Sequence, residues 1–398
     1  MAEDLTGTVA KHYNELQETG LDTRSQSRIF YLRNFNNWIK SVLIGDTLQQ
    51  IRENKGENQG ISVLDLCSGK GGDLLKWKKG KISKVVCADI AGTSVEQCES
   101  RYNEILERNK RERYFTEMFT AEFITADCTK TRLRAMYKDP SMKFDLASCQ
   151  FSFHYCFESF PQAQTMLQNA CECLELGGYF IGTTPNSYEI MKRLRESPDK
   201  KCGNEVYSIS YDGEDFNKPG LFGAKYNFHL EGVVDCPEFL VYFPLLEKMA
   251  EEYGMKLISR TPFAQYFKEN VDKGENRSLL GKMQALEPYP ADRDAKLVSD
   301  LDSDYAATSE VVKNMHANDD RPEEEKRRRP QRVGTLSKAE WEAGTIYLVF
   351  VFQKVLDKQT GKKWQTKKKE EEEECHVNLK RPSEESIPQS AEKLPKVT

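Results

Sequence analysis

Between residues 61 and 185, five short apolar runs alternate with helical segments, and this alternation restricts the possible folds more than any other feature of the chain. Parallel strands need a long crossover connection, usually a helix, whereas antiparallel strands can be joined by a tight turn. Strands that alternate with helices therefore predict a parallel, doubly wound α/β sheet. We expect the five strands at residues 61–66, 83–90, 121–127, 143–151 and 177–185.

The segments on either side complete the predicted fold. Apolar residues at three- and four-residue steps predict an N-terminal amphipathic helix over 25–51. Period-two runs between turn residues predict an inserted antiparallel ribbon over 204–236, and an apolar helix follows Pro237. Further strands are expected at 255–263 and 345–354, the last one antiparallel, which makes a mostly parallel sheet of seven strands.

The chain divides into one large domain and a tail. We assign residues 1–356 to the domain, because apolar runs recur throughout it. Residues 357–398 contain blocks of like charge and almost no core residues, so we predict that they are disordered.

Charge and cysteine content exclude several classes of protein. The net charge is −5, so a nucleic-acid site would have to be a local basic patch. The 11 cysteines are scattered without a C-x-x-C pair, which excludes the usual zinc and thioredoxin patterns and fits a reducing compartment. We find neither a membrane span nor an apolar signal core.

A glycine-rich turn, LDLCSGKGGDLLKW at residues 64–77, follows the first predicted strand. Gly69 and Gly71 allow the backbone to approach a ligand closely. Asp89 ends the second predicted strand, about twenty residues beyond the turn, where an acid commonly holds both ribose hydroxyls. Asp127 ends the third strand and is placed to accept a hydrogen bond from an adenine amino group. The turn is therefore predicted to bind an adenosine-containing ligand.

Two phosphate-binding templates do not fit this turn. The dinucleotide pattern G-x-G-x-x-G would need glycine at Leu74, and the P-loop would need serine or threonine where Gly71 follows Lys70. A cofactor with adenosine and no phosphates fits better, and S-adenosylmethionine is the common one. The alternative is a turn that binds nothing and has a structural role alone.

The same turn is similar to the cofactor loop of eukaryotic mRNA cap guanine-N7 methyltransferases, and the resemblance extends over roughly residues 9–354. It implies a class I S-adenosylmethionine-dependent methyltransferase that methylates N7 of the terminal guanosine of the 5′ cap of pre-mRNA in the nucleus. It also implies association with the transcribing RNA polymerase II and with a small activating subunit. The other segments that carry it are FYLRNFNNWIK (30–40), CQFSFHYCF (149–157), GGYFIGTTPN (177–186), GVVDCPEFLVYFPLL (232–246), MQALEPYP (283–290) and GTLSKAEWEAGTIYLVF (334–350).

The resemblance implies two sets of site residues. The cofactor would be held by Lys40, the backbone of residues 67–69 with Cys67 and Gly69, Asp89, Asp127, Gln150 and Tyr155. The cap would be approached by Asn36, Asn37, Lys70, Lys76, Arg101, His154, Glu238 and Tyr347, of which His154, Glu238 and Tyr347 form the catalytic set. The chain departs from the family at Cys67, where the family usually has glycine; if the turn needs a positive φ or close access there, cofactor affinity and with it activity should be lowered, while the fold should be unaffected.

The implied reaction needs little acid–base chemistry. Guanine N7 has an in-plane lone pair and no proton, so its methylation needs neither a general base nor a metal, and alignment dominates. Glu238 would accept from guanine N1 and N2, while His154 and Tyr347 would hydrogen-bond to the base or stack on it. Lys70, Lys76 and Arg101 would hold the triphosphate bridge.

Each of these residues also has a structural interpretation. His154 and Tyr347 could belong to the core, and Glu238 could stabilise the start of a helix. The lysines could be solvated, and Arg101 could pair within its own helix. The basic runs at 326–332 and 362–369 could be import signals, RNA-backbone patches or plain solvated charge.

Two other functions stay open at this point. The chain could methylate a different RNA or a small molecule, or it could bind caps or RNA without catalysis. Methylation of capped but not uncapped RNA would distinguish a cap methyltransferase from an enzyme with another acceptor. A cofactor titration would distinguish it from a protein that binds caps or RNA without catalysis.

Overall fold

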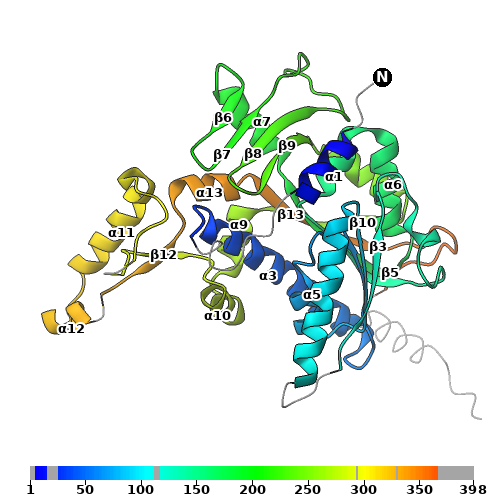
Figure 1. Ribbon diagram of the computed structural model, residues 1–398, viewed down its shortest axis with the longest axis horizontal. Helices are drawn as coiled ribbons and strands as arrows, with labels where there is room; N and C mark the ends of the chain where they lie inside the picture. Colours follow the sequence, from blue (N-terminus) through cyan, green and yellow to red (C-terminus); the bar gives the residue numbers. More distant parts are fainter. Residues whose placement is uncertain (1–4, 16–25, 112–116, 293–294, 329, 366–398) are drawn as a thin grey trace, which may run out of the picture.

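The computed structural model describes residues 5–15, 26–111, 117–292, 295–328 and 330–365, and a seven-stranded sheet lies at its centre (Figure 1). The strand order is β10-β13-β5-β4-β1-β2-β3. The strands are β1 (Ser62–Leu66), β2 (Lys84–Asp89), β3 (Thr120–Thr125), β4 (Phe144–Gln150), β5 (Leu174–Pro185), β10 (Met255–Pro262) and β13 (Tyr347–Lys354).

Strand directions confirm the α/β, doubly wound, mostly parallel sheet. β3, β2, β1, β4 and β5 pair parallel, and β13 runs antiparallel to both of its neighbours, β5 and β10. Every residue of β4 is buried, which explains an apolar run without alternation in a strand that is covered on both faces. Asp127, expected at the end of the third strand, lies just beyond β3.

Helices cover both faces of the sheet. The N-terminal amphipathic helix is α3 (Phe30–Lys55), which packs on the face that contains Val63 and Leu146. Leu64 and Ala147, one position further along the same strands, face α6 (Phe160–Cys171) and α8 (Phe243–Glu251). The other helical elements of the core are α1 (Thr6–Glu15), α4 (Leu74–Lys79), α5 (Gly92–Arg111), η1 (Leu133–Ala135), η2 (Phe153–Glu158), α7 (Ser187–Glu196), α9 (Phe263–Asn270) and α10 (Gly274–Lys282).

The predicted ribbon is a four-stranded antiparallel sheet in the order β6-β7-β8-β9. Its strands are β6 (Lys201–Gly203), β7 (Tyr207–Ser210), β8 (Lys225–Leu230) and β9 (Val234–Phe239). The helix expected directly after Pro237 is wrong as placed, because Pro237 and Glu238 belong to β9 and α8 begins only at Phe243. Glu238 therefore does not stabilise a helix start; it is the buried partner of Tyr226 across the β8–β9 hairpin.

A small lobe follows α10 and extends to one side, away from the seven-stranded sheet (Figure 1). It contains β11 (Glu287–Tyr289), η3 (Asp302–Tyr305), α11 (Ala306–Ala317), α12 (Glu323–Arg328) and β12 (Val333–Thr335), and α13 (Lys338–Gly344) leads back into β13.

Arg28 joins several of these parts electrostatically. Its guanidinium lies 2.8 Å from Glu205 of the ribbon segment, 3.2 Å from Asp304 of the lobe and 3.8 Å from Glu340 of α13. The segment before α3 thereby holds ribbon, lobe and α13 together.

The predicted tail boundary at residue 357 differs from the structure. Trp364 donates its backbone N–H to Val355, Leu356 bridges to Lys363, and the Trp364 ring packs against Gly177 of β5. Residues 357–365 therefore fold back onto the domain. The disorder predicted for the rest of the tail lies outside the described residues, as does the second half of the basic run at 362–369. Among the described residues, no helix is long and apolar enough to span a membrane.

Candidate functional site

The glycine-rich turn adopts a backbone that few residues tolerate. Cys67, Gly69 and Gly71 have φ angles of 54°, 51° and 73°, all in the left-handed region that favours glycine. A Cβ on Gly71 would approach Leu74 Cδ1 to 2.7 Å and Cys98 Sγ to 2.8 Å, so this glycine also allows the turn to pack on α4 and α5. Cys67 is thus a side-chain-bearing residue at a position suited to glycine.

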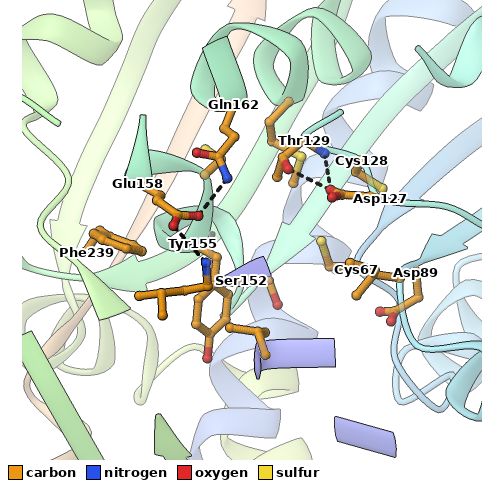
Figure 2. Close-up of a pocket in the computed structure, with 15 residues that line it drawn as sticks. Cys67, Asp89, Asp127, Cys128, Thr129, Ser152, Tyr155, Glu158, Gln162 and Phe239 are labelled. Carbon is orange, nitrogen blue, oxygen red and sulfur yellow. Dashed lines mark hydrogen bonds between the residues drawn. The ribbon is translucent and has the colours of Figure 1, made fainter. Parts of the chain in front are cut away.

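A cavity opens beside this turn, at the carboxyl ends of the parallel strands (Figure 2). It encloses about 670 Å³, part of which is open to solvent. Four of the predicted cofactor residues line it: Cys67, Asp89, Asp127 and Tyr155. Its other lining residues are mostly apolar, so the cavity combines largely apolar walls with three acids, Asp89, Asp127 and Glu158, and a few polar groups in an apolar pocket are the usual make-up of a small-molecule site.

Asp89 is both a cavity wall and a support for the turn. Its Oδ2 accepts from the Gly69 N–H and its Oδ1 from the Ala91 N–H, each at 2.9 Å. Burial raises the pKa of Asp89, and these backbone donors oppose that rise. Each carboxylate oxygen has a second lone pair, so Asp89 can still accept hydrogen bonds from a ligand in the cavity.

Asp127 lies on the opposite side of the cavity from Tyr155 (Figure 2). Its Oδ1 accepts from the Thr129 N–H at 2.9 Å and from the Thr129 hydroxyl at 2.6 Å. This turn fixes one oxygen and leaves the other carboxylate oxygen 3.5 Å from Lys130 Nζ.

Lys40 and Lys76 are paired with one buried acid. Asp73 Oδ1 lies 2.8 Å from Lys40 Nζ and 2.7 Å from Lys76 Nζ, and Lys76 also donates to Asn37 Oδ1 at 2.5 Å. Burial alone would raise the pKa of Asp73, but the two lysines outweigh it and hold the pKa below its usual value. Lys76 is only 10% exposed, so the structure places it in the α3–α4 contact rather than on the surface.

Asp65 adds a second acid beneath this cluster. Its Oδ2 accepts from Trp77 Nε1 at 3.0 Å, and burial together with the charge of Asp73 raises the pKa of Asp65 to about 7. The base of the turn is therefore held by a buried network of opposite charges.

A second group of predicted residues meets between η2, the ribbon and β13. Glu238 Oε1 lies 3.2 Å from His154 Nε2, and Glu238 Oε2 accepts from the Tyr226 hydroxyl at 2.6 Å. His154, Glu238 and Tyr226 are 1%, 2% and 1% exposed. The close approach of His154 to Glu238 is not aligned as a hydrogen bond, and neither ring nitrogen has a well-directed partner among the described residues. Polar side chains buried with unmet capacity mark a place where a ligand can bind.

Aromatic contacts place Tyr347 beside this group. Its ring packs edge-on against Phe151 at 5.0 Å and against Phe228 of β8 at 6.5 Å, and tilted against Phe263 at 5.7 Å. Tyr155 connects the two groups, because it lines the cavity, its ring lies 4.3 Å from that of His154, and its hydroxyl is 3.4 Å from Cys236 Sγ.

The remaining predicted residues lie around these two groups. The Gln150 side chain donates to Ser148 at 3.0 Å and accepts from Thr183 at 3.1 Å, which fixes it at the end of β4. Asn36 is in α3, with a buried Oδ1 that lacks a protein partner among the described residues. Lys70 is in the turn and Arg101 is on α5, both half-buried.

Sequence reasoning missed several cavity residues. Ile90 and Cys128 follow the two predicted acids directly, so their adjacency was a usable signal. Phe239 directly follows Glu238 within the 232–246 segment, so it could have been found in the same way. Leu5 and Val9 of the N-terminal segment, Glu158 and Gln162 also line the cavity, but no motif marks them. Tyr226 gave no signal either, because its role depends on which residue it faces across the hairpin.

Comparisons with known proteins agree on one family. The family model for the mRNA (guanine-N(7))-methyltransferase domain matches residues 1–355. The chain is 51% identical over 351 residues to an mRNA cap guanine-N(7) methyltransferase of Drosophila melanogaster, covering 88% of this chain and 77% of that one. It is 42% identical to that of Caenorhabditis elegans, with 92% and 89% covered, and 36% identical to mRNA cap guanine-N(7) methyltransferase 1 of Oryza sativa subsp. japonica, with 87% and 80% covered.

Proposed function

Because this chain belongs to the mRNA (guanine-N(7))-methyltransferase family, we propose that it transfers the methyl group of S-adenosylmethionine to N7 of the guanosine cap of pre-mRNA. The observation that carries the proposal is the family match over residues 1–355 together with a cavity at the strand ends that contains Asp89 and Asp127.

The cavity suits an adenosine ligand. Asp89 would accept from both ribose hydroxyls, and Asp127 would accept from the adenine amino group through the carboxylate oxygen that Thr129 leaves available. The apolar side chains of the walls would cover the purine. S-adenosylmethionine, when bound, supplies an electrophilic methyl group on a sulfonium.

The protein's contribution is positioning and electrostatics. Glu238 would accept from N1 and N2 of guanine, and its charge would favour the cation that N7 methylation creates. Tyr347 would pack on the base, and His154 would offer a nitrogen to it. Since N7 carries no proton, none of these side chains has to remove one.

The cap triphosphate would be held by Lys70 of the turn and Arg101 of α5, both half-buried. Lys76 and Asn37 bind each other, and Lys40 binds Asp73, so we propose that these three shape the wall between cap and cofactor. Asn36, with its unmet Oδ1, would accept from the substrate or from water.

We further propose that the enzyme acts in the nucleus, where pre-mRNA is capped. Contacts with a small activating subunit and with RNA polymerase II are proposed from the family resemblance alone.

A methylation assay tests the function. The full chain, labelled S-adenosylmethionine and RNA with a GpppG cap should yield label at guanine N7, whereas the same RNA without a cap should stay unlabelled. Label on uncapped RNA would favour the alternative that this enzyme methylates a different RNA. Cap binding without label and without cofactor binding would favour the non-catalytic alternative.

A further inference from the structure

The β8–β9 hairpin places two buried polar side chains face to face. Tyr226 and Glu238 are direct partners in the antiparallel register, so their side chains lie on the same face of the ribbon. The Tyr226 hydroxyl donates to Glu238 Oε2 at 2.6 Å, a length typical of a hydrogen bond to a charged oxygen.

Among the described residues, the groups beside this carboxylate carry no full positive charge of a lysine or arginine. The ionisable groups beside it are His154 and Tyr155 of η2, Cys236 of β9 and Tyr347 of β13. None is a lysine or arginine, and His154 approaches Oε1 without hydrogen-bond alignment. A buried carboxylate with few donors is costly, so the phenol hydroxyl is its main stabilising contact.

Tyr226 keeps its proton under all working conditions. Burial, and next the charge of Glu238, raises the pKa of Tyr226 well above its usual value. The hydroxyl is therefore a permanent donor, and it fixes the rotation of the Glu238 carboxyl group while Oε1 faces His154.

We propose that Tyr226 is a positioning residue for guanine selection: its hydroxyl orients the Glu238 carboxylate so that the two oxygens meet the N1 and N2 hydrogens of guanine together. This rests on the proposed role of Glu238. Inosine lacks the 2-amino group and presents the N1 hydrogen alone. A freely rotating carboxylate can still accept from one hydrogen, but it is less often oriented to accept from two. Loss of the Tyr226 hydroxyl should therefore weaken the binding of guanosine more than that of inosine.

The test compares the equilibrium binding of the dinucleotides GpppG and IpppI to the full chain, because IpppI lacks the 2-amino group at both ends. Tyr226→Phe keeps the ring volume and removes the hydroxyl alone. We expect wild type to prefer GpppG, and Tyr226→Phe to reduce that preference by about tenfold, the effect of one hydrogen bond to a charged group. The affinity for S-adenosylmethionine should stay within about twofold of wild type.

Tyr305→Phe is the matched control. Tyr305 is also buried, and its hydroxyl donates to a buried carboxylate, Glu287, at the same 2.6 Å, but it lies in the lobe. This variant should leave the GpppG preference unchanged, while both variants lower the melting temperature.

Each result decides something. An unchanged preference in Tyr226→Phe overturns the positioning role while wild-type methylation of capped RNA still supports the proposed function. An equal fall of the GpppG preference in Tyr305→Phe also overturns the positioning role, because a general loosening of the fold would then explain both results. If Tyr226→Phe loses the preference for GpppG while the wild-type protein does not methylate capped RNA, the inference is supported and the proposed function is refuted. Binding of neither dinucleotide by wild type would overturn both.

Discussion

At the scale of single residues, Cys67 is the most unusual position in the site. It has a φ of 54° and its side chain lines the cavity, so the thiol group occupies space that glycine would leave to a ligand. Its sulfur interacts with Cys128 and Cys149. Cys128 lowers the pKa of the Cys67 thiol, but Cys149 and burial outweigh it and raise that pKa well above its usual value, so the thiol is a poor nucleophile, in keeping with the proposed reaction, which needs none.

Cys67→Gly should tighten S-adenosylmethionine binding by about 1 kcal/mol, because the Cβ and sulfur no longer narrow the cavity. Release of the strain at a positive φ should offset the extra unfolded-state entropy of glycine, so the melting temperature without cofactor should stay level or rise. Calorimetric titration of the two proteins side by side measures the first effect. Weaker binding in Cys67→Gly would mean that the thiol makes a useful contact.

Asp89→Asn should weaken S-adenosylmethionine binding by about 2 kcal/mol or more, because an amide can accept at only one of its two positions. The amide nitrogen would also face the N–H of Gly69 or Ala91, so the turn itself should loosen. Calorimetry gives the affinity, and thermal melting shows whether the variant is folded.

Asp139→Asn is the control for this substitution. Asp139 accepts from the backbone and hydroxyl of Ser141 in an exposed turn, in the same way that Asp127 accepts from Thr129. It should leave affinity unchanged, and unchanged affinity in a folded Asp89→Asn protein would remove Asp89 from the cofactor site.

At the scale of secondary-structure elements, Glu340 connects two helices. It forms a capping box with Ser337 at the start of α13, and its Oε1 accepts from the Leu32 N–H of α3 at 3.1 Å. Its side chain is fully buried, and burial raises its pKa to about 7 although Ser337, Leu32 and Arg28 oppose the rise.

This pKa predicts a pH-dependent stability. At pH values between the unfolded pKa of Glu340, near 4.5, and its folded pKa of about 7, the unfolded chain has released the Glu340 proton that the folded chain still holds. The free energy of unfolding should therefore fall as pH rises through this interval, by about 3 kcal/mol from this group.

Glu340→Gln should remove that dependence. The variant should be slightly less stable than wild type at pH 5 and equal or better at pH 8. Urea unfolding at several pH values measures the difference between the two proteins. If the free energy of unfolding changes with pH in the same way in both proteins, Glu340 would be ionised over the whole pH range.

At the scale of the whole molecule, the last described segment belongs to the domain although its composition resembles a tail. A chain that ends at Val355 would lose the Leu356–Lys363 bridge and the packing of Trp364 on Gly177. We expect a loss of about 1–2 kcal/mol in stability, from one partly buried indole. Turnover on capped RNA should be retained, because neither Trp364 nor Leu356 lines the cavity beside the glycine-rich turn.

A chain that ends at Gln365 is the matched comparison and should keep full stability. Thermal melting and the methylation assay on both shortened chains check this. Equal melting temperatures would mean that Trp364 contributes nothing, and a loss of activity in the Gln365 chain would show that later residues act in the reaction.

Local sequence was sufficient for much of this fold. The alternation of apolar runs with helices predicted the parallel sheet, because parallel strands are joined by helical crossovers and strands covered on both faces are largely apolar. Asp89 and Asp127 were predicted beside the turn for a similar reason, since the carboxyl ends of parallel strands share one edge.

Tertiary contacts decided the rest. Glu238 after Pro237 suggested a helix start, but pairing with β8 made it part of a strand, since hairpin register overrides a local preference. Lys40 and Lys76 stay predicted ligand contacts, and nothing in the sequence indicated that both side chains would also reach Asp73, which depends on how α3 packs on α4. Trp364 in a charge-rich segment gave no local sign that it would find Gly177. Periodicity along the chain thus determines which elements form, whereas the partners of long or buried side chains follow only from how those elements pack.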